Sequence, residues 1–395
     1  MPVLLAAAGF LLVGLDGSVN IAFPALSAAF RVDPTTMRWV IIYYVGTYAL
    51  TAFAAGVLAD RFGPGRVMRA GLILSLFCFA AYALAPSFAM FLLLRVLQGV
   101  SAGLILGVAP ALVTLSLPSS RHAWGLGWAS MGLGLGLSVS PLIGGALVGA
   151  FGWQGAFLYR VPVAAGLIVL AASTREARRD GRSAWRMVAP ADILRWPVLQ
   201  AGLLTFLANY AQFATWLLAP FYLVAERGLS AAAAGLLFML MPLATAVASP
   251  VAGRATDRWG PRGPMAAGLA AEAAGLLLVA RCGGSTPIAL VGAALALVGA
   301  GLGVFQVPNI AEAMAAFPPR QQGAAGGVAF LSRTAGVVVG VQTAAWLFHD
   351  RAQVLGFLPA FRFTFTAAAA VCALAALAAL LPGRERGPRA TRHEA

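Results

Sequence analysis

Long apolar stretches dominate this chain and constrain its fold more than any other feature. A helix that crosses a bilayer needs about 20 mostly apolar residues. Twelve stretches of this kind are separated by short breaks such as Asp33-Pro34 and Leu117-Pro118. Their approximate bounds are 3–30, 39–59, 67–85, 88–115, 123–149, 156–173, 197–225, 231–252, 265–281, 287–315, 323–348 and 363–381. The sequence therefore predicts an all-α integral membrane protein with twelve transmembrane helices.

Composition and charge support a membrane protein. Charged residues make up 10% of the chain and hydrophobic residues 61%, whereas about a quarter of a soluble domain is charged. The net charge of +14 comes from arginines that lie mainly in the breaks, which is typical of membrane topology rather than of nucleic-acid binding. The three cysteines are far apart, so neither a disulfide framework nor a metal site is predicted.

The chain contains an internal repeat. GVLADRFGPGRVMRAGL begins at Gly56, and GRATDRWGPRGPMAAGL begins 197 residues later at Gly253, with nine identical positions. That offset is close to half the length of the chain, so we predict two similar helical bundles in the same order. The predicted parts are an N-terminal six-helix bundle (1–173), a polar linker (174–196), a C-terminal six-helix bundle (197–381) and a tail (382–395).

The distribution of arginine predicts the orientation. Eighteen arginines lie in alternate breaks and in the tail, and seven, Arg160 among them, lie on the other side. The positive-inside rule places the richer side in the cytoplasm. We therefore expect a multi-pass protein of the inner (plasma) membrane with both termini in the cytoplasm.

A buried acid in the first apolar stretch is the main functional candidate. Asp16 lies about 20 Å along the first helix, where a carboxylate is costly and usually functional. We predict that Asp16 exchanges protons and that Arg95, on the fourth helix, is its counter-charge. The alternatives are a static ion pair for Asp16 and an arginine reaching the membrane interface for Arg95. Asn20 and Gln98 are predicted to share the faces of these two residues.

Polar and aromatic residues in the second half are predicted to line a substrate cavity with Asn20 and Gln98. Amides beside aromatic rings suit an amphipathic ligand, although an aromatic belt at the membrane interface is the alternative. These residues are Asn209, Gln212, Trp216, Gln306, Asn309 and Arg333. Glu272 also lies within an apolar stretch, and structural and functional roles for it are equally open.

Two further groups are predicted to control helix movement. The acids and arginines of the repeat lie at cytoplasmic helix ends, where they can form an ion-pair gate or a solvated turn. The gate comprises Gly56, Asp60, Arg61, Gly63, Arg66, Asp257 and Arg258. Small residues on the fifth helix allow another helix to approach closely. We expect them mostly to serve helix packing, and the functional alternative is a close seam between the halves that governs which side opens. They are Gly132, Gly136, Ser140, Pro141, Gly144 and Gly145.

Several of these motifs resemble those of a known family. The motif G-x-x-x-D-R-x-G at 56–63 and 253–260, Leu94-Arg95-x-x-Gln98-Gly99, Leu15 to Pro24 (LDGSVNIAFP) and Ser140 to Gly145 (SPLIGG) are similar to signatures of the major facilitator superfamily. The resemblance is closest to the drug–proton antiporter branch of the EmrB/QacA type. The chain departs from that branch in having twelve rather than fourteen stretches, and Arg160 instead of asparagine before Val161-Pro162.

The resemblance implies a secondary transporter that exports small amphipathic compounds in exchange for protons by alternating access. No ATP-binding, zinc-protease or nucleophile motif is found, so we expect no enzyme activity and no cofactor beyond the proton gradient. The expected partners are a small-molecule substrate, protons and the lipid bilayer, with no nucleic acid, and the protein is expected to be a monomer. The alternatives are a transporter of a sugar, amino acid or siderophore and, from another class, a non-transporting sensor or enzyme.

Overall fold

The described part of the chain is helical throughout. The computed structural model describes residues 1–118, 122–173, 196–315 and 322–381, so the predicted linker up to residue 195 and the tail lie outside it. The first half contains α1 (Pro2–Gly14), η1 (Leu15–Gly17), α2 (Ser18–Ile21), α3 (Phe23–Phe30), η2 (Pro34–Met37), α4 (Arg38–Phe62), α5 (Pro64–Tyr82), α6 (Phe88–Ser116), α7 (His122–Phe151), α8 (Gly155–Leu158) and α9 (Arg160–Ser173). The second half contains α11 (Trp196–Phe221), η4 (Tyr222–Glu226), α12 (Ala231–Trp259), α13 (Arg262–Arg281), α14 (Ile288–Ala315), α15 (Gln322–Leu355) and α16 (Phe357–Ala379).

Each of the twelve predicted stretches is occupied by helix. Ten helical segments in the described ranges are long and apolar enough to cross a membrane. A helix suits the bilayer because it satisfies its own backbone hydrogen bonds where water is absent.

The first membrane segment is interrupted where Asp16 lies. The short 3₁₀ helix η1 separates α1 from α2, and a 3₁₀ stretch inside a helix often marks a functional site. The glycines on either side of Asp16 allow close packing. A Cβ on Gly14 would collide with the backbone of α7 at Leu133, and one on Gly17 would collide with the hydroxyl of Ser140. The interruption therefore brings the Asp16 backbone close to α7.

The sequence repeat produces the same helix–turn–helix structure twice. Gly63 ends α4 with a φ of 87° and Gly260 ends α12 with a φ of 75°, conformations that glycine adopts more readily than other residues. Each glycine N–H donates to the carbonyl four residues earlier, of Ala59 and of Thr256 respectively, at 2.9 Å. The repeat thus fixes one helix end in each half.

Several helices extend beyond the approximate apolar stretches. The largest extension is between 349 and 362, where α15 continues to Leu355 and α16 begins at Phe357. His349, Asp350 and Arg351 are compatible with a helix that extends beyond the apolar stretch, because polar side chains do not by themselves end a helix. The chain turns instead at Gly356, whose φ is 82°.

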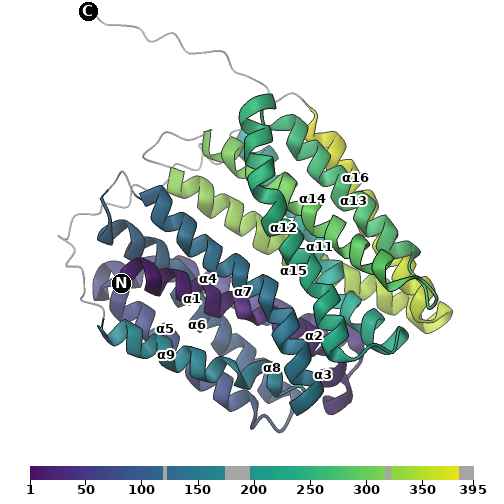
Figure 1. Cartoon of the computed structure of the whole chain (residues 1–395), viewed down its shortest axis with the longest axis horizontal. Helices are drawn as coiled ribbons and strands as arrows, with labels where there is room; N and C mark the ends of the chain where they lie inside the picture. The colour runs from purple at the N-terminus through teal and green to yellow at the C-terminus, as the bar shows by residue number, and fades with distance from the viewer. Residues whose placement is uncertain (119–121, 174–195, 316–321, 382–395) are drawn as a thin grey trace, which may run out of the picture.

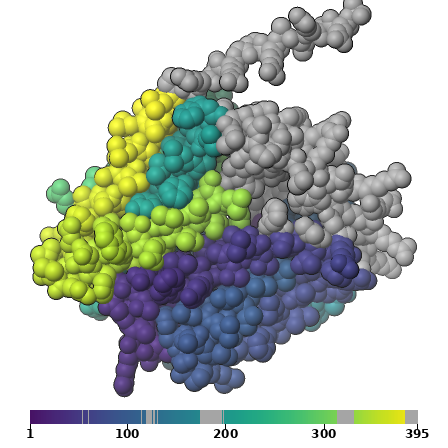
Figure 2. All heavy atoms as spheres, turned by 180° about the vertical axis from the view of Figure 1, so that it is seen from behind, coloured from purple at the N-terminus to yellow at the C-terminus, as the bar shows by residue number. Residues whose placement is uncertain are grey.

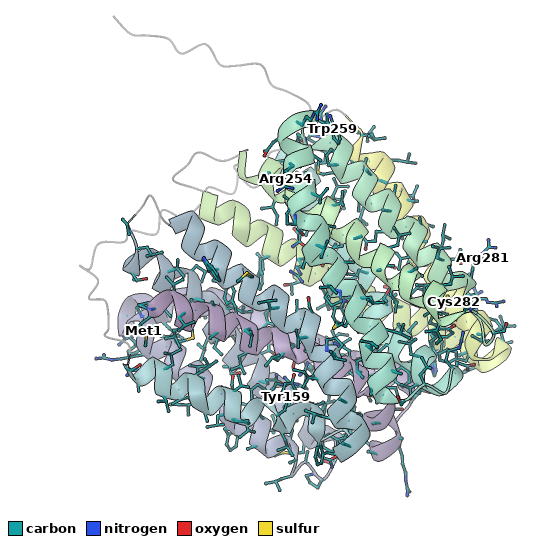
Figure 3. The ribbon with its side chains drawn as sticks, viewed as in Figure 1. Met1, Tyr159, Arg254, Trp259, Arg281 and Cys282 are labelled. Atoms are coloured by element: carbon teal, nitrogen blue, oxygen red, sulfur yellow. The ribbon has the colours of Figure 1, made fainter. Side chains whose placement is uncertain are left out.

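The helices form two groups that contact each other toward one end (Figure 1). Helix α7 of the first group packs along α12 of the second, and α11 packs against α2 and α3. On the opposite face, α15 lies along α4 (Figure 2). Met1 and Trp259, at the end predicted to face the cytoplasm, lie far apart, one in each group (Figure 3). The groups are therefore closed together at the end that holds α2 and α3.

The small residues of α7 divide between two neighbours, one within the first group and one across the seam between the groups. Gly132 and Gly136 face the backbone of α1 at Ala7 and Leu11, and Gly144 faces Ser18. These contacts lie within the first group. Gly145 instead packs on Ala231 of α12, and Gly235 of α12 packs on the carbonyl of Pro141. Neighbouring positions on a helix are about 100° apart, so residues spaced by four share one face. That face of α7 packs on the first membrane segment. Pro141 and Gly145 lie one position further along and form the seam with α12.

Candidate functional site

Asp16 is the centre of a buried polar cluster formed by helices of the first group. Its Oδ1 accepts hydrogen bonds from Arg95 Nη1 at 2.9 Å, Arg160 Nη1 at 2.9 Å and Gln98 Nε2 at 2.8 Å. Its Oδ2 accepts one bond, from Arg95 Nη2 at 2.9 Å. The Asp16 side chain is 12% exposed, compared with 3% for Arg95. The predicted pairing of Asp16 with Arg95 is therefore present as a bidentate ion pair, an arrangement of high geometric specificity.

Helix α6 supplies both Arg95 and Gln98, which are one turn apart. Arg95 also donates from Nε to the carbonyl of Val40 at 3.0 Å and from Nη1 to Gln98 Oε1 at 2.8 Å. Its guanidinium lies 4.2 Å from the ring centroid of Tyr44. These contacts hold the guanidinium inside the helix group, so Arg95 does not reach the membrane interface in this structure.

Arg160 is the residue that sequence reasoning misplaced. It was counted among the arginines outside the membrane, but it is fully buried at the start of α9 and pairs with Asp16. Its Nη2 donates to Ser18 Oγ at 3.1 Å and to the carbonyl of Ala156 at 2.8 Å. Helices α8 and α9 meet at this residue, and its side chain points into the group. The replacement of the usual asparagine by Arg160 was the only sequence signal for this role.

Aromatic residues close the cluster. The Tyr82 hydroxyl donates to Gln98 Oε1 at 2.8 Å, and the Tyr159 hydroxyl donates to the carbonyl of Leu15 at 3.1 Å. Figure 3 shows Tyr159 within the N-terminal group. The Arg160 guanidinium lies 4.9 Å from the ring centroid of Phe79 and 5.2 Å from that of Phe157. The two guanidiniums are therefore held by rings as well as by hydrogen bonds.

Asn20 does not join this cluster. Its amide donates over 3.5 Å to the carbonyl of Gly17, and its side chain is half-buried. The expectation that it shares the face of Asp16 assumed a regular α-helix. The 3₁₀ geometry of η1 has three residues per turn instead of 3.6, and this change rotates Asn20 away from the carboxylate.

In the second group, the predicted cavity residues form a polar junction between α11 and α14. Asn309 Nδ2 donates to the Thr205 hydroxyl at 2.6 Å and to the carbonyl of Ala201 at 3.1 Å. Asn209 donates to the carbonyl of Thr205 at 2.8 Å. Both asparagines are buried. Asn309 joins α14 to α11, whereas the bond from Asn209 lies within α11.

The other predicted cavity residues differ in their burial. Gln212 is buried, Gln306 and Arg333 are half-buried, and Trp216 packs on Phe238 of α12 with ring centroids 5.0 Å apart. Their role as a cavity lining stays a prediction.

The predicted gate residues lie on the last turns of α4 and α12 and on the following helix. Asp257 and Arg258 are exposed, and Asp257 forms no ion pair within the described ranges. Arg258 and Arg61 each lie over the ring of the next residue, Trp259 and Phe62. A gate that closes when these ends approach each other stays a prediction.

Glu272 is a second buried acid, in a very different setting. It is fully buried on α13, and neither of its carboxyl oxygens has a hydrogen-bond partner within the described part of the chain. Gly301 of α14 packs directly on its backbone, and Cys372 of α16 lies close to its side chain. No arginine pairs with it in the described ranges. Its position is away from the seam between the groups.

The model of the Major Facilitator Superfamily matches this chain twice, over residues 5–200 and 201–395. The chain belongs to the major facilitator superfamily. It is therefore a membrane transporter with the major facilitator fold, and it takes a small-molecule substrate. The two matched segments divide the chain close to the start of α11.

Two curated relatives in the superfamily align with most of the chain. The drug efflux pump JefA of Mycobacterium tuberculosis is 27% identical, with 88% of this chain and 81% of JefA covered. The riboflavin transporter RibZ of Clostridioides difficile is 23% identical, with 80% of this chain and 81% of RibZ covered.

A solved structure in the superfamily shares the fold. The crystal structure of a bacterial homologue of the human lysosomal transporter Spinster, in an inward-facing and unoccupied conformation, superposes with a TM-score of 0.79. It is 16% identical and covers 96% of this chain and 95% of its own.

Proposed function

We propose that this chain exports small amphipathic compounds from a bacterial cytoplasm in exchange for protons. The observation that carries the proposal is the Asp16 carboxylate, which lies within a membrane-spanning segment on four hydrogen bonds from Arg95, Arg160 and Gln98. Ionisable groups at such depth are rare and usually serve transport. The relationship to JefA supports export of a drug-like compound.

In the proposed cycle, Asp16 carries the proton. A proton from outside neutralises the carboxylate and weakens its bonds to Arg95, and the substrate is released outward. The carrier then returns to the state in which the α2 and α3 end is closed, and Asp16 loses its proton to the cytoplasm. The four hydrogen bonds to the carboxylate support the last step, because they come from N–H donors that pair with its ionised form.

The gate and the topology belong to the same proposal. We place the chain in the inner membrane as a monomer with both termini in the cytoplasm. When the cytoplasmic ends of the two groups approach, Asp60, Arg61, Asp257 and Arg258 form ion pairs that hold them together.

The test is transport into inverted membrane vesicles that contain the full chain. Ethidium serves as the amphipathic probe, and an imposed proton gradient drives it inward. Uptake by the wild-type chain is expected to fall to the level of protein-free vesicles when the gradient is collapsed. Asp16→Asn is expected to abolish gradient-driven uptake, whereas Glu272→Gln, a change at the other buried acid, is the matched control. Uptake that persists without the gradient would rule out antiport, and full coupling in Asp16→Asn would exclude Asp16.

A second candidate is transport of a specific metabolite. The relationship to RibZ, a riboflavin transporter, favours it. The same vesicles separate the two functions when they are given riboflavin. Saturable uptake of riboflavin together with background uptake of ethidium would favour the metabolite transporter.

A further inference from the structure

The charges around Asp16 do not balance. One carboxylate pairs with two guanidiniums, Arg95 and Arg160, and neither arginine pairs with another acid in the described ranges. The cluster therefore carries one net positive charge inside the helix group. The remaining titratable groups near it are neutral at ordinary pH and come from α4, α5 and the junction of α8 and α9. They are Tyr44, Tyr48, Cys78, Tyr82 and Tyr159.

The two oxygens of Asp16 are occupied unequally. Three donors converge on Oδ1, from Arg95, Arg160 and Gln98, whereas Oδ2 has only Arg95 Nη2. A proton that adds to Oδ1 would have to displace donors from three side chains. Addition to Oδ2 breaks a single hydrogen bond, to Arg95. The contacts therefore favour Oδ2 as the oxygen that takes the proton.

The two arginines differ in how firmly they are fixed. Arg160 has no exposed surface, and its Nε and Nη2 both donate to the carbonyl of Ala156, one turn earlier. A third bond joins Nη2 to Ser18 Oγ. Apart from Asp16, Arg95 has two partners, the carbonyl of Val40 and Gln98 Oε1. Arg160 thus has more bonds that do not involve the carboxylate, and Arg95 is the one arginine whose bond to Asp16 is weakened when Oδ2 takes a proton.

We propose that Arg160 is a positioning residue. It binds Oδ1 of Asp16 and thereby favours the ionised form of this carboxyl group. The proton then enters at Oδ2, where it breaks the Arg95 Nη2 bond and changes the net charge of the cluster from one to two positive charges. Because this step adds to an existing surplus of positive charge, it takes place at a lower pH than it would in a cluster that contained Arg95 alone. Arg160 therefore sets the pH at which the carrier takes up its proton. The inference deepens the proposed function, since it rests on proton exchange at Asp16.

The experiment measures protonation of Asp16 without any substrate. The infrared C=O stretching band of protonated carboxyl groups is recorded against pH for the purified full chain. Glu272→Gln is the background throughout, because Glu272 is the other buried acid in the described ranges. Subtraction of the Asp16→Asn spectrum isolates the Asp16 band. Arg160→Gln removes the charge and keeps an amide donor, Arg160→Lys keeps the charge, and Arg160→Asn is a second neutral variant.

The expected result is a shift of the Asp16 band to higher pH in both neutral variants. The shift should be about 1 to 3 pH units, the usual effect of a neighbouring arginine on an aspartate, and it should be smaller in Arg160→Lys. An unchanged midpoint in Arg160→Gln and Arg160→Asn would overturn the proposal. An equally large shift in Arg160→Lys would also overturn it, because the charge would then not be the cause. Since no transport is measured, failure of the vesicle assay would reject the export function and leave this result standing.

Discussion

The seam between α7 and α12 gives the sharpest prediction, for the substitution Gly145→Ala. A Cβ at Gly145 would lie 3.0 Å from the carbonyl carbon of Ala231, 3.1 Å from Cα of Gly235 and closer still to the Ala231 carbonyl oxygen. Ordinary van der Waals contacts begin at 3.4 Å. The neighbours are backbone atoms, which cannot rotate away, so the two helices must separate.

The size of the effect follows from overpacking. An extra methyl group in a well-packed interior costs about 1 to 3 kcal/mol. This cost falls on the conformation in which α7 and α12 touch at Gly145, and an alternative conformation with a looser seam avoids it. A difference of about 1 to 3 kcal/mol changes the ratio of two conformations about 5- to 150-fold. Gly145→Ala should therefore populate a state that is minor in the wild-type chain.

The assay is a distance measurement between spin labels, one in each helix group. Ala28 at the end of α3 and Glu226 at the end of η4 are both exposed and take the labels as cysteines. The three native cysteines are buried and are replaced beforehand. Gly149→Ala is the matched control, because Gly149 is one turn further along α7 and has no atom within 4 Å of its added Cβ. Gly145→Ala should add a longer-distance population that Gly149→Ala lacks.

The reasoning is refuted if Gly145→Ala and Gly149→Ala give the same distance distributions. It is also refuted if the longer distance appears in both, because substitution anywhere on this part of α7 would then have the same effect. In either case the close contact at Gly145 would not be what holds the two groups together.

Two predictions concern stability and use thermal unfolding in detergent. Gly63→Ala and Gly260→Ala should each lower Tm, with a cost of about 1 to 3 kcal/mol. Both positions have positive φ, and both have open space around an added Cβ, so the cost comes from the backbone conformation. Gly134→Ala, a helical site with equal space, is the control and should not lower Tm. Glu272→Met should keep or raise Tm, since each buried polar atom without a partner costs about 1 to 3 kcal/mol, and a clear fall in Tm would show that the carboxyl group has a partner.

The fold could be predicted largely from the sequence because its two strongest signals are local. Each apolar stretch is long enough to predict a spanning helix by itself, and the repeat at Gly56 and Gly253 marks equivalent positions in the two halves. The break between α15 and α16 is shorter than the gap between the apolar stretches because hydropathy records where a helix leaves the membrane. It does not record where the helix ends, which at Gly356 depends on a backbone conformation.

The site could be predicted only in part because it depends on which side chains the packing brings together. Asp16 and Arg95 stood out as charges inside apolar stretches. Arg160 did not, since it lies beside a break between stretches, and its burial depends on the direction in which α9 begins. The spacing of small residues on α7 revealed a close contact but not the partner, and most of the stripe proved to face the first segment.

The polar side chains of α11 have a consequence for how the second group assembles. Polar groups inside a membrane are costly unless neighbouring helices cover them, and α11 carries the buried amides of Asn209 and Gln212. The helix packs against α14, α15 and α16. Each of these helices follows α11 in the chain, so α11 gains its full burial only after the last of them has been synthesised.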